Sequence, residues 1–280
     1  GYILAAPSVL IVILIILFPI SFAIVSSFFD YTLINKSFNN FIGIENYLNA
    51  IKNERLFNSI VVTFFFVILV VFFEFVLGFF IALLLNKIEK FKSIYYFILL
   101  LPLLINPIVV GLIWRMFLHP QLGILNYLLS LLGIEPVNWL GDPQMAFVTI
   151  IFVDIWHQVS FMIILLLAGL SAIPKEPYEA ARSDGANIID CFLHITLPYM
   201  RPVIIVTILI RLIFAIKTYD LIYIMTKGGP GDATDLISYY IYRSAFISLN
   251  LGEAAAMSSI LLTIIILLTL PLFKYMNRSD

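Results

Sequence analysis

The chain has 280 residues, of which 62% are hydrophobic and 12% charged, and its formal net charge is −1. Soluble domains carry about 25% charged residues, so most of this chain must lie in lipid. The charge balance excludes nucleic acid as a partner, because phosphate binding requires a concentrated basic surface. The single cysteine, Cys191, excludes an intramolecular disulfide, and with 3 histidines the chain has too few soft ligands for a metal cluster.

The first apolar segment begins at the start of the chain. No charged residue occurs between Gly1 and Phe29. This interval is too long for the core of a signal peptide, so we predict a retained membrane span. Because the chain begins with Gly rather than Met, we expect that a short N-terminal segment precedes it.

Six apolar segments are long enough for membrane spans, which need about 20 residues each. They are residues 8–29, 57–86, 94–118, 145–173, 203–226 and 254–273. Backbone groups in lipid must bond within their own segment, so all six are predicted to be helices, with kinks at the prolines of the first and third. The predicted fold is an all-α integral membrane protein with six transmembrane helices in a single domain, 1–280.

Lys and Arg residues in the loops predict the orientation, because cytoplasmic loops collect positive charge. One side of the membrane would carry Lys87, Lys90, Lys92, Lys175, Arg182, Arg201, Lys274 and Arg278. The other side would carry only Lys36, Lys52, Arg55, Lys227 and Arg243, in longer loops. We therefore expect both termini, and the loop 174–202, to be cytoplasmic.

A polar segment, residues 179–202, separates the fourth and fifth apolar segments. Glu179 is predicted to open a short helix, where the helix dipole favours a carboxylate, and Gly185 to end it. Apolar residues at helical spacing predict a second short helix from Ile188. Pro198 and Pro202 would then close this helix–turn–helix before the fifth span.

The spacing within this segment matches a known signature. It reads Glu-Ala-Ala, three residues, Gly, nine residues, Ile, any residue, Leu-Pro, filled here by Glu179, Ala180, Ala181, Gly185, Ile195, Leu197 and Pro198. The segment resembles the cytoplasmic loop of ATP-binding-cassette (ABC) importer permeases, which implies a type I importer fold with a cytoplasmic coupling helix.

The resemblance to binding-protein-dependent sugar permeases extends over nearly the whole chain. Its motifs are Pro7-Ser8, Gly43 to Tyr47, Asn58-Ser59, Trp139-Leu140, Ala168-Gly169-Leu170, Ile173-Pro174, Tyr219-Asp220, Thr226 to Pro230 and Tyr239 to Tyr242. The Gly-Gly-Pro loop followed by Thr234 is similar to the first of the two permeases in maltose-type and glycerol-phosphate-type systems.

This resemblance implies partners in a bacterial or archaeal cytoplasmic membrane. They are a second permease, two ATPase subunits, an extracytoplasmic solute-binding protein contacting loops 30–56 and 119–144, and a sugar or oligosaccharide. Glu179 and Asp184 would contact an ATPase, Ala180, Ala181 and Gly185 would permit close seating, and Leu197-Pro198 would transmit motion. The chain lacks a Gly-x-x-x-x-Gly-Lys loop, so ATP and Mg would lie on the partners and this chain would be no enzyme.

Polar residues inside the spans mark a pathway or a pair, because they are costly in lipid. Asp154, His157, Gln158 and Phe161 share one face of the fourth span. The fifth span offers Arg211 and Thr218 on one face, followed by Tyr219. In the resembling permeases the sugar lies near mid-membrane against these two helices, so these seven residues are the predicted substrate pathway.

Other interpretations remain open at this stage. Asp154 and Arg211 could pair structurally, and Glu74, alone in the second span, would face another subunit or a protonated carboxyl partner. A secondary transporter or channel could use Asp154, His157 and Arg211 as a relay, but the sequence shows no convincing internal repeat. Spacings typical of intramembrane hydrolases are missing.

Overall fold

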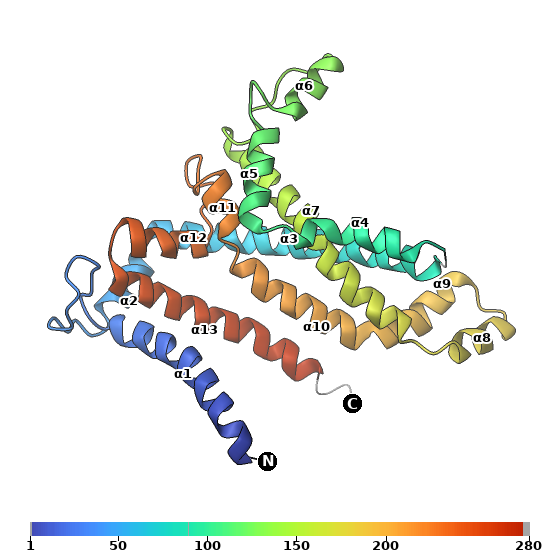
Figure 1. Ribbon diagram of the computed structural model, residues 1–280, viewed down its shortest axis with the longest axis horizontal. Coiled ribbons are helices and arrows are strands. Elements are labelled where there is room, and N and C mark those ends of the chain that lie inside the picture. Colours follow the sequence, from blue (N-terminus) through green and yellow to red (C-terminus); the bar gives the residue numbers. More distant parts are fainter. Residues whose placement is uncertain (1, 89, 277–280) are drawn as a thin grey trace. The chain divides into compact units, whose positions relative to one another are not determined.

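The computed structural model describes residues 2–88 and 90–276. Regular structure in these ranges is helical, and the extended chain there pairs only in two isolated bridges, Phe29 with Phe41 and Thr32 with Asn250. Figure 1 shows the helices α1 to α13 along the chain. The all-α class is confirmed. Arg278, used for the predicted orientation, lies outside the described residues.

Four stretches of the described chain are long and apolar enough to cross a membrane: α3 (Glu54–Lys87), α7 (Pro143–Ser171), Ile188–Met225 and Leu251–Pro271 of α13 (Leu251–Met276). A bent helix pair would make a fifth. The first predicted span, 8–29, corresponds to α1 (Tyr2–Ser26), whose described apolar part is the shorter helix Leu10–Ser26. By length and apolar composition, the described residues thus supply four spans, or five if the bent pair is one span, in addition to α1.

The third predicted span, 94–118, is wrong as one helix. It consists of α4 (Lys92–Leu104) and α5 (Pro107–Phe117), whose axes differ by 91°. Pro107 lacks the N–H that would continue α4, and Asn106 caps the new helix by accepting a hydrogen bond from Ile108 N at 2.9 Å. The expected kink is thus a complete break.

The observed helix in the region of the fifth predicted span, 203–226, differs from the prediction at both ends. Its helix, α10 (Leu197–Ile216), follows directly from α9 (Ile188–Cys191) and the π-helical segment η1 (Phe192–Thr196). The sequence predicted that Pro198 and Pro202 would close the preceding unit, and this prediction is wrong because the helix continues through both residues. In η1, Leu197 N–H bonds the carbonyl of Phe192, five residues back, and this wider turn lets the helix pass through Pro198. After Lys217 the chain breaks and resumes as α11 (Asp220–Met225).

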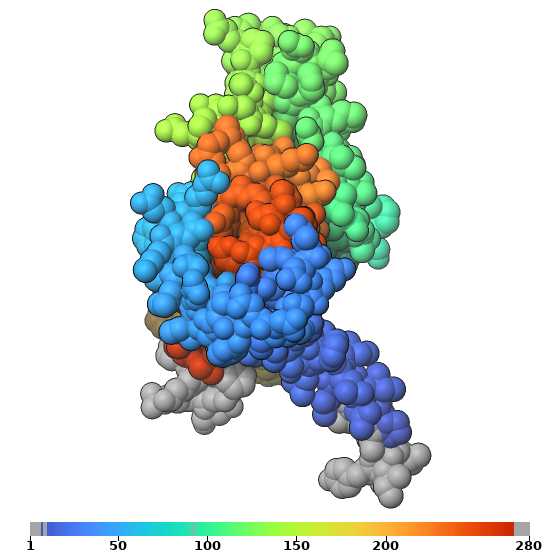
Figure 2. Space-filling view, turned by 90° about the vertical axis from the view of Figure 1, so that its left-hand side faces the viewer, coloured from blue at the N-terminus to red at the C-terminus, as the bar shows by residue number. Residues whose placement is uncertain are grey.

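The helices belong to two compact units. The first comprises Gly1–Val61 and Leu236–Leu268. Its apolar core joins α2 (Glu45–Lys52), the start of α3, α12 (Ile237–Tyr242) and α13 through Ala50, Leu56, Ile237, Tyr240 and Met257. The π-helical segment η2 (Arg243–Ile247) follows α12. Figure 2 shows this unit's blue N-terminal segment against its orange-red segment, where Leu33 N–H bonds Leu249 O and Gly252 N–H bonds Tyr31 O.

The second unit comprises Val62–Asp235 and Thr269–Asp280 and is organised around α7, which packs on α4, α5, α10 and α11. It also holds α6 (Ile124–Leu131) and α8 (Glu176–Ser183), one on each side of α7 in the chain. Glycines allow close helix contacts here: a Cβ at Gly78 of α3 would lie 2.7 Å from Met162 Cβ, and one at Gly169 of α7 would lie 2.8 Å from Val203 Cγ1 of α10.

The glycine contact between α7 and α10 can be tested directly. Gly169→Val would force α10 away from α7, and overpacking of this kind costs about 1–3 kcal/mol. We expect a lower thermal unfolding midpoint for the purified protein. Ala168→Val adds a similar volume to the exposed neighbouring position and is the matched control. Equal midpoints for the two variants would contradict close packing at Gly169.

Candidate functional site

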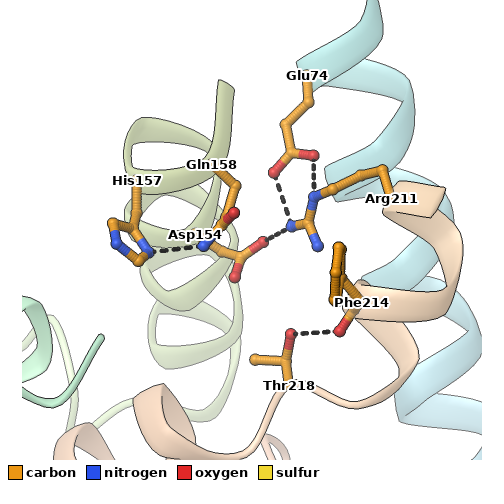
Figure 3. Close-up of polar contacts among 7 residues, drawn as sticks. All are labelled: Glu74, Asp154, His157, Gln158, Arg211, Phe214 and Thr218. Atoms are coloured by element: carbon orange, nitrogen blue, oxygen red, sulfur yellow. Dashed lines mark hydrogen bonds and ion pairs between the residues drawn. The ribbon is translucent and has the colours of Figure 1, made fainter. Parts of the chain in front are cut away.

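Three charged side chains from three helices meet inside the second unit (Figure 3). Arg211 of α10, Glu74 of α3 and Asp154 of α7 are only 1%, 0% and 4% exposed. Arg211 Nε donates to Glu74 Oε2 at 2.5 Å and Nη2 donates to Glu74 Oε1 at 2.8 Å. Nη2 also donates to Asp154 Oδ2. We call these residues the charge triad.

The triad shows one of the interpretations that the sequence left open. Asp154 and Arg211 do pair across α7 and α10. Glu74 does not face another subunit, which was one of the two expectations, because it is fully buried and holds the guanidinium in a two-pronged contact. The sequence signal for this contact was the presence of Glu74, Asp154 and Arg211 inside three apolar segments, since buried charges must be paired.

Only one of the two carboxylate oxygens of Asp154 bonds Arg211. Figure 3 shows its second carboxylate oxygen turned away from the guanidinium. Arg211 thus fixes the orientation of the carboxylate and leaves its second oxygen, which we call the outer oxygen, without a contact to the guanidinium.

His157 and Gln158 are organised by the break between α4 and α5. His157 Nε2 lies 3.0 Å from the carbonyl oxygen of Ile105, which can only accept, so we assign the ring proton to Nε2. His157 Nδ1 then accepts from Gln158 Nε2 at 2.9 Å. Both ring nitrogens of His157 are therefore engaged within the chain, and Gln158 is held with its carbonyl oxygen as the remaining acceptor.

The remaining predicted pathway residues lie near the break after α10. Phe161 of α7 packs edge-on against Phe214 of α10, with ring centroids 6.1 Å apart. Thr218 Oγ1 bonds Phe214 O at 3.5 Å, and Tyr219 stacks on Tyr223 at 5.6 Å. The structure thus brings α7 and α10 residues together through the triad and this ring pair. Phe214 was missed because nothing distinguishes it among 25 phenylalanines.

The polar segment after α7 consists of two short helices with well-defined ends. Its helix α8 begins at Glu176, three residues before the predicted start, and ends at Ser183. Gly185 has a φ of +86°, and Ala186 N–H bonds Ala181 O while Gly185 N–H bonds Arg182 O, which is the Schellman termination predicted for glycine. Asn187 and Asp190 then form a capping box that starts α9.

The signature residues of this segment form an accessible surface. Tyr178 OH lies 2.9 Å from Thr196 Oγ1 and joins α8 to η1, and no residue of α8 is buried. Ala181, Ile195 and Leu197 are half-buried. The exposed signature residues are Glu179, Ala180, Gly185 and Pro198, and Asp184 between them is exposed as well. We call residues 176–198 the coupling segment.

These features together define a class of protein. Long apolar helices, a buried charge cluster beside a polar helix face, and an exposed polar segment running into one of those helices describe a membrane transporter subunit with a site for a soluble partner. Among the described residues, no cluster of three or more His, Cys, Asp or Glu side chains is arranged to hold a metal ion.

The chain belongs to the family of binding-protein-dependent transport system inner membrane components, which matches residues 74–279. It is therefore a permease subunit of an ABC importer and a multi-pass membrane protein. The finding supports the importer and not the secondary transporter that the sequence left as an alternative.

Named relatives cover almost the whole chain. The trehalose/maltose transport system permease protein MalF of Thermococcus litoralis is 38% identical over 96% of this chain and 90% of its own length. The sn-glycerol-3-phosphate transport system permease protein UgpA of Agrobacterium fabrum is 31% identical over 99% and 94%. In a solved bacterial ABC transporter that imports the acidic polysaccharide alginate, one chain superposes with a TM-score of 0.87 and 25% identity, over 99% and 94%.

The charge triad yields a stability prediction. Arg211→Met would leave two carboxylates buried together without their cation, and breaking a buried ion pair in this way costs about 3–5 kcal/mol. We expect a correspondingly lower free energy of unfolding in detergent. The triple variant Arg211→Met, Glu74→Gln, Asp154→Asn leaves no unpaired charge and should recover most of the loss. An unchanged stability of Arg211→Met would contradict the triad.

Proposed function

We propose that this chain forms half of the membrane pathway for a sugar or oligosaccharide. A second, homologous permease forms the other half, two ATPase subunits bind and hydrolyse ATP with Mg, and an extracytoplasmic binding protein delivers the cargo. The observation that carries this proposal is the exposed coupling segment, which continues without interruption into the helix that holds Arg211.

The coupling segment is the proposed contact with an ATPase. Glu179 and Asp184 are exposed and supply polar groups, while Ala180, Ala181 and Gly185 present a low surface that another protein can approach closely. Ile195 and Leu197 anchor the segment, and Leu197-Pro198 lead into α10. The segment and both termini would face the cytoplasm, on the inner face of a bacterial or archaeal cytoplasmic membrane.

The relatives support the sugar class. Their names include a trehalose/maltose permease, a sulfoquinovosyl glycerol permease and an alginate importer. Within this chain, the positive charge of Arg211 is already matched by two carboxylates. The triad itself therefore adds no net attraction for an anionic cargo.

The proposed sugar-binding face combines acceptors and rings. The outer oxygen of Asp154 and the carbonyl oxygen of Gln158 would accept hydrogen bonds from sugar hydroxyls. Phe161, Thr218 and Tyr219 would supply a ring, a hydroxyl and a second ring beside them. Arg211 would act by positioning Asp154, and His157 by orienting Gln158.

Substitution of Gly185 tests the coupling segment. Gly185→Asp places a charged side chain at a left-handed position on the surface that would seat against the ATPase. We expect normal membrane insertion, loss of ATPase co-purification and loss of uptake. Retention of the ATPase subunits and normal uptake by this variant would contradict the proposed contact.

Gly133→Asp is the matched control for that experiment. Gly133 also has a positive φ, +73°, and a Cβ there would meet nothing within 4 Å, as at Gly185. The two substitutions therefore carry a similar backbone cost. Gly133 lies outside the coupling segment, because Gly133 precedes α7 in the chain and the coupling segment follows α7. The Gly133 variant should retain its ATPase subunits.

Substitution of Gln158 tests the sugar-binding face. Gln158→Met keeps the volume and removes the acceptor, and one lost hydrogen bond of about 0.5–1.5 kcal/mol corresponds to a rise in the KM of uptake of roughly 2- to 12-fold. Ile164→Met, at an exposed position on another face of α7, is the control and should leave the KM unchanged. An unchanged KM for Gln158→Met would remove this residue from the pathway.

A further inference from the structure

A cavity separate from the charge triad lies where the end of α5 meets α11 and the loop that follows it. The two helices lie side by side (Figure 1). The volume of the cavity is about 430 Å³, and sites for small molecules typically have roughly 300–1,000 Å³. Part of its wall is formed by Thr226, Gly229 and Pro230 of the Gly-Gly-Pro motif. Neither the sugar pathway nor the coupling segment uses this motif, so the cavity has no role in the function proposed above.

The walls of this pocket are held in place by contacts within the chain. A Cβ at Gly111 of α5 would lie 3.0 Å from Ile224 Cγ2, so α5 packs tightly on α11. In the loop, Thr234 Oγ1 lies 2.7 Å from the carbonyl oxygen of Gly229 and 2.8 Å from Thr226 Oγ1. The pocket is therefore formed before any ligand binds, which lowers the entropy cost of binding.

The polar groups of the pocket are mainly donors. Arg115 Nη1 donates to the carbonyl of Ile224 at 3.2 Å, which uses one of the five N–H groups of a guanidinium. His119 Nδ1 accepts from the backbone N–H groups of Gln121 and Leu122, so its proton is on Nε2, which is a donor. The nine lining residues include no Asp or Glu. The pocket is therefore suited to an anion.

An apolar stripe on α5 leads to these two donors. Ile108, Leu112 and Met116 are 41%, 52% and 63% exposed. They are four residues apart and so lie on one face of the helix. Arg115 and His119 follow Leu112 by three and seven residues, which places them on the same face. A ligand in the pocket can therefore also cover the stripe, provided that it carries apolar chains.

The pocket has the surroundings of a membrane–water interface. No charged residue occurs between Lys92 and Arg115, so Arg115 ends a long uncharged stretch. Its neighbour Trp114 packs edge-on against Phe152 and Trp156 of α7, with ring centroids 5.4 and 5.5 Å apart. Trp and Arg side chains gather at the level of the lipid headgroups, because each has an apolar body and a polar end. This places the pocket among the headgroups and the stripe against the acyl chains.

This combination selects the chemistry of the ligand. A guanidinium and an imidazole N–H match the oxygens of a phosphate. Free phosphate has nothing to cover the apolar stripe. The ammonium group of a zwitterionic headgroup would find no carboxylate among the lining residues. The best match is therefore a phospholipid with a net negative charge.

We propose that the pocket binds the phosphate of one anionic phospholipid between Arg115 and His119, with the acyl chains along the apolar stripe of α5. The site is independent of the cargo, because it requires only that the chain lies in a membrane. A lipid bound there would join α5 to the Gly-Gly-Pro loop after α11. Because a ligand of the folded state stabilises it, the importer should be more stable when the site is occupied.

The test uses the assembled importer, purified in detergent and depleted of lipid, with phosphatidylglycerol as the probe. Native mass spectrometry gives the Kd of the most tightly bound lipid. We expect Arg115→Gln to raise this Kd about 10- to 100-fold, the range of a charge-assisted hydrogen bond. Arg115→Lys keeps the charge but not the fork of donors, so its Kd should be intermediate. Lys36→Gln removes an exposed cation of the first unit and is the control, with an unchanged Kd.

A second variant keeps the proposal testable if Arg115→Gln fails to assemble. His119→Asp retains an acceptor for the N–H groups of Gln121 and Leu122 and places a negative charge beside the phosphate. We expect a rise in the Kd at least as large as that of Arg115→Gln. A wild-type Kd in either variant that assembles would overturn the proposal.

Two further ligands identify the source of the anion. Phosphatidylglycerol should raise the thermal unfolding midpoint of the wild type, and inorganic phosphate at the same concentration should leave it unchanged. Phosphatidylcholine should bind more weakly than phosphatidylglycerol. Equal stabilisation by inorganic phosphate would indicate a site for a free anion, and equal affinity for phosphatidylcholine would indicate ordinary lipid contact. Either result would overturn the lipid site and leave the importer function standing, because neither measurement involves uptake.

Discussion

The structure of the second unit depends on one buried contact, the salt-bridged cluster of Glu74, Arg211 and Asp154. Apolar helices in lipid gain little from mutual burial and slide easily past one another, because lipid tails are as apolar as their side chains. The triad removes that freedom. The two-pronged contact of Arg211 with Glu74 sets α10 against α3, and the contact with Asp154 sets α10 against α7. Buried ion clusters contribute little net stability, so we infer that its role here is to fix the register of three helices.

The helix breaks lie beside this fixed core. The break between α4 and α5 exposes the carbonyl of Ile105, and His157 of α7 satisfies it from one turn beyond Asp154. The break after α10 places Thr218 and Tyr219 next to the Phe161–Phe214 pair. Irregular backbone at membrane depth persists only where protein covers it or water reaches it, so breaks beside one polar helix face are expected along a pathway. The side chains that bond the backbone groups near these breaks therefore also orient the acceptors that a sugar would meet.

The sequence predicted the features that depend on local chemistry. The Schellman turn at Gly185 followed from the conformational freedom of glycine, and the apolar segments followed from the need to satisfy backbone groups in lipid. It failed where an unusual helical turn or a distant residue decides the structure. Pro198 and Pro202 normally stop helices, but the π-helical turn at Phe192–Thr196 carries the chain past them. Glu74 lies 137 positions from its partner Arg211, so no periodicity within its own helix could reveal the pair. The break at Pro107 has local causes, but the packing of α5 on α11, which local sequence does not encode, holds its angle at 91°.

The continuity from the coupling segment to the triad constrains how motion can travel. Leu197 and Arg211 belong to one helix, about 21 Å apart at 1.5 Å per residue, so a displacement at Leu197 reaches Arg211 with little loss. Arg211 would then either separate from the carboxylates of Glu74 and Asp154 or move together with them. Leaving would expose buried unpaired charge at about 3–5 kcal/mol, whereas shifting packed helices together keeps every contact. We infer that α3, α7 and α10 move as one body around the triad. The bending must then occur where the backbone is already interrupted, at 105–106 and 217–219, the two positions next to the residues proposed to hold the sugar.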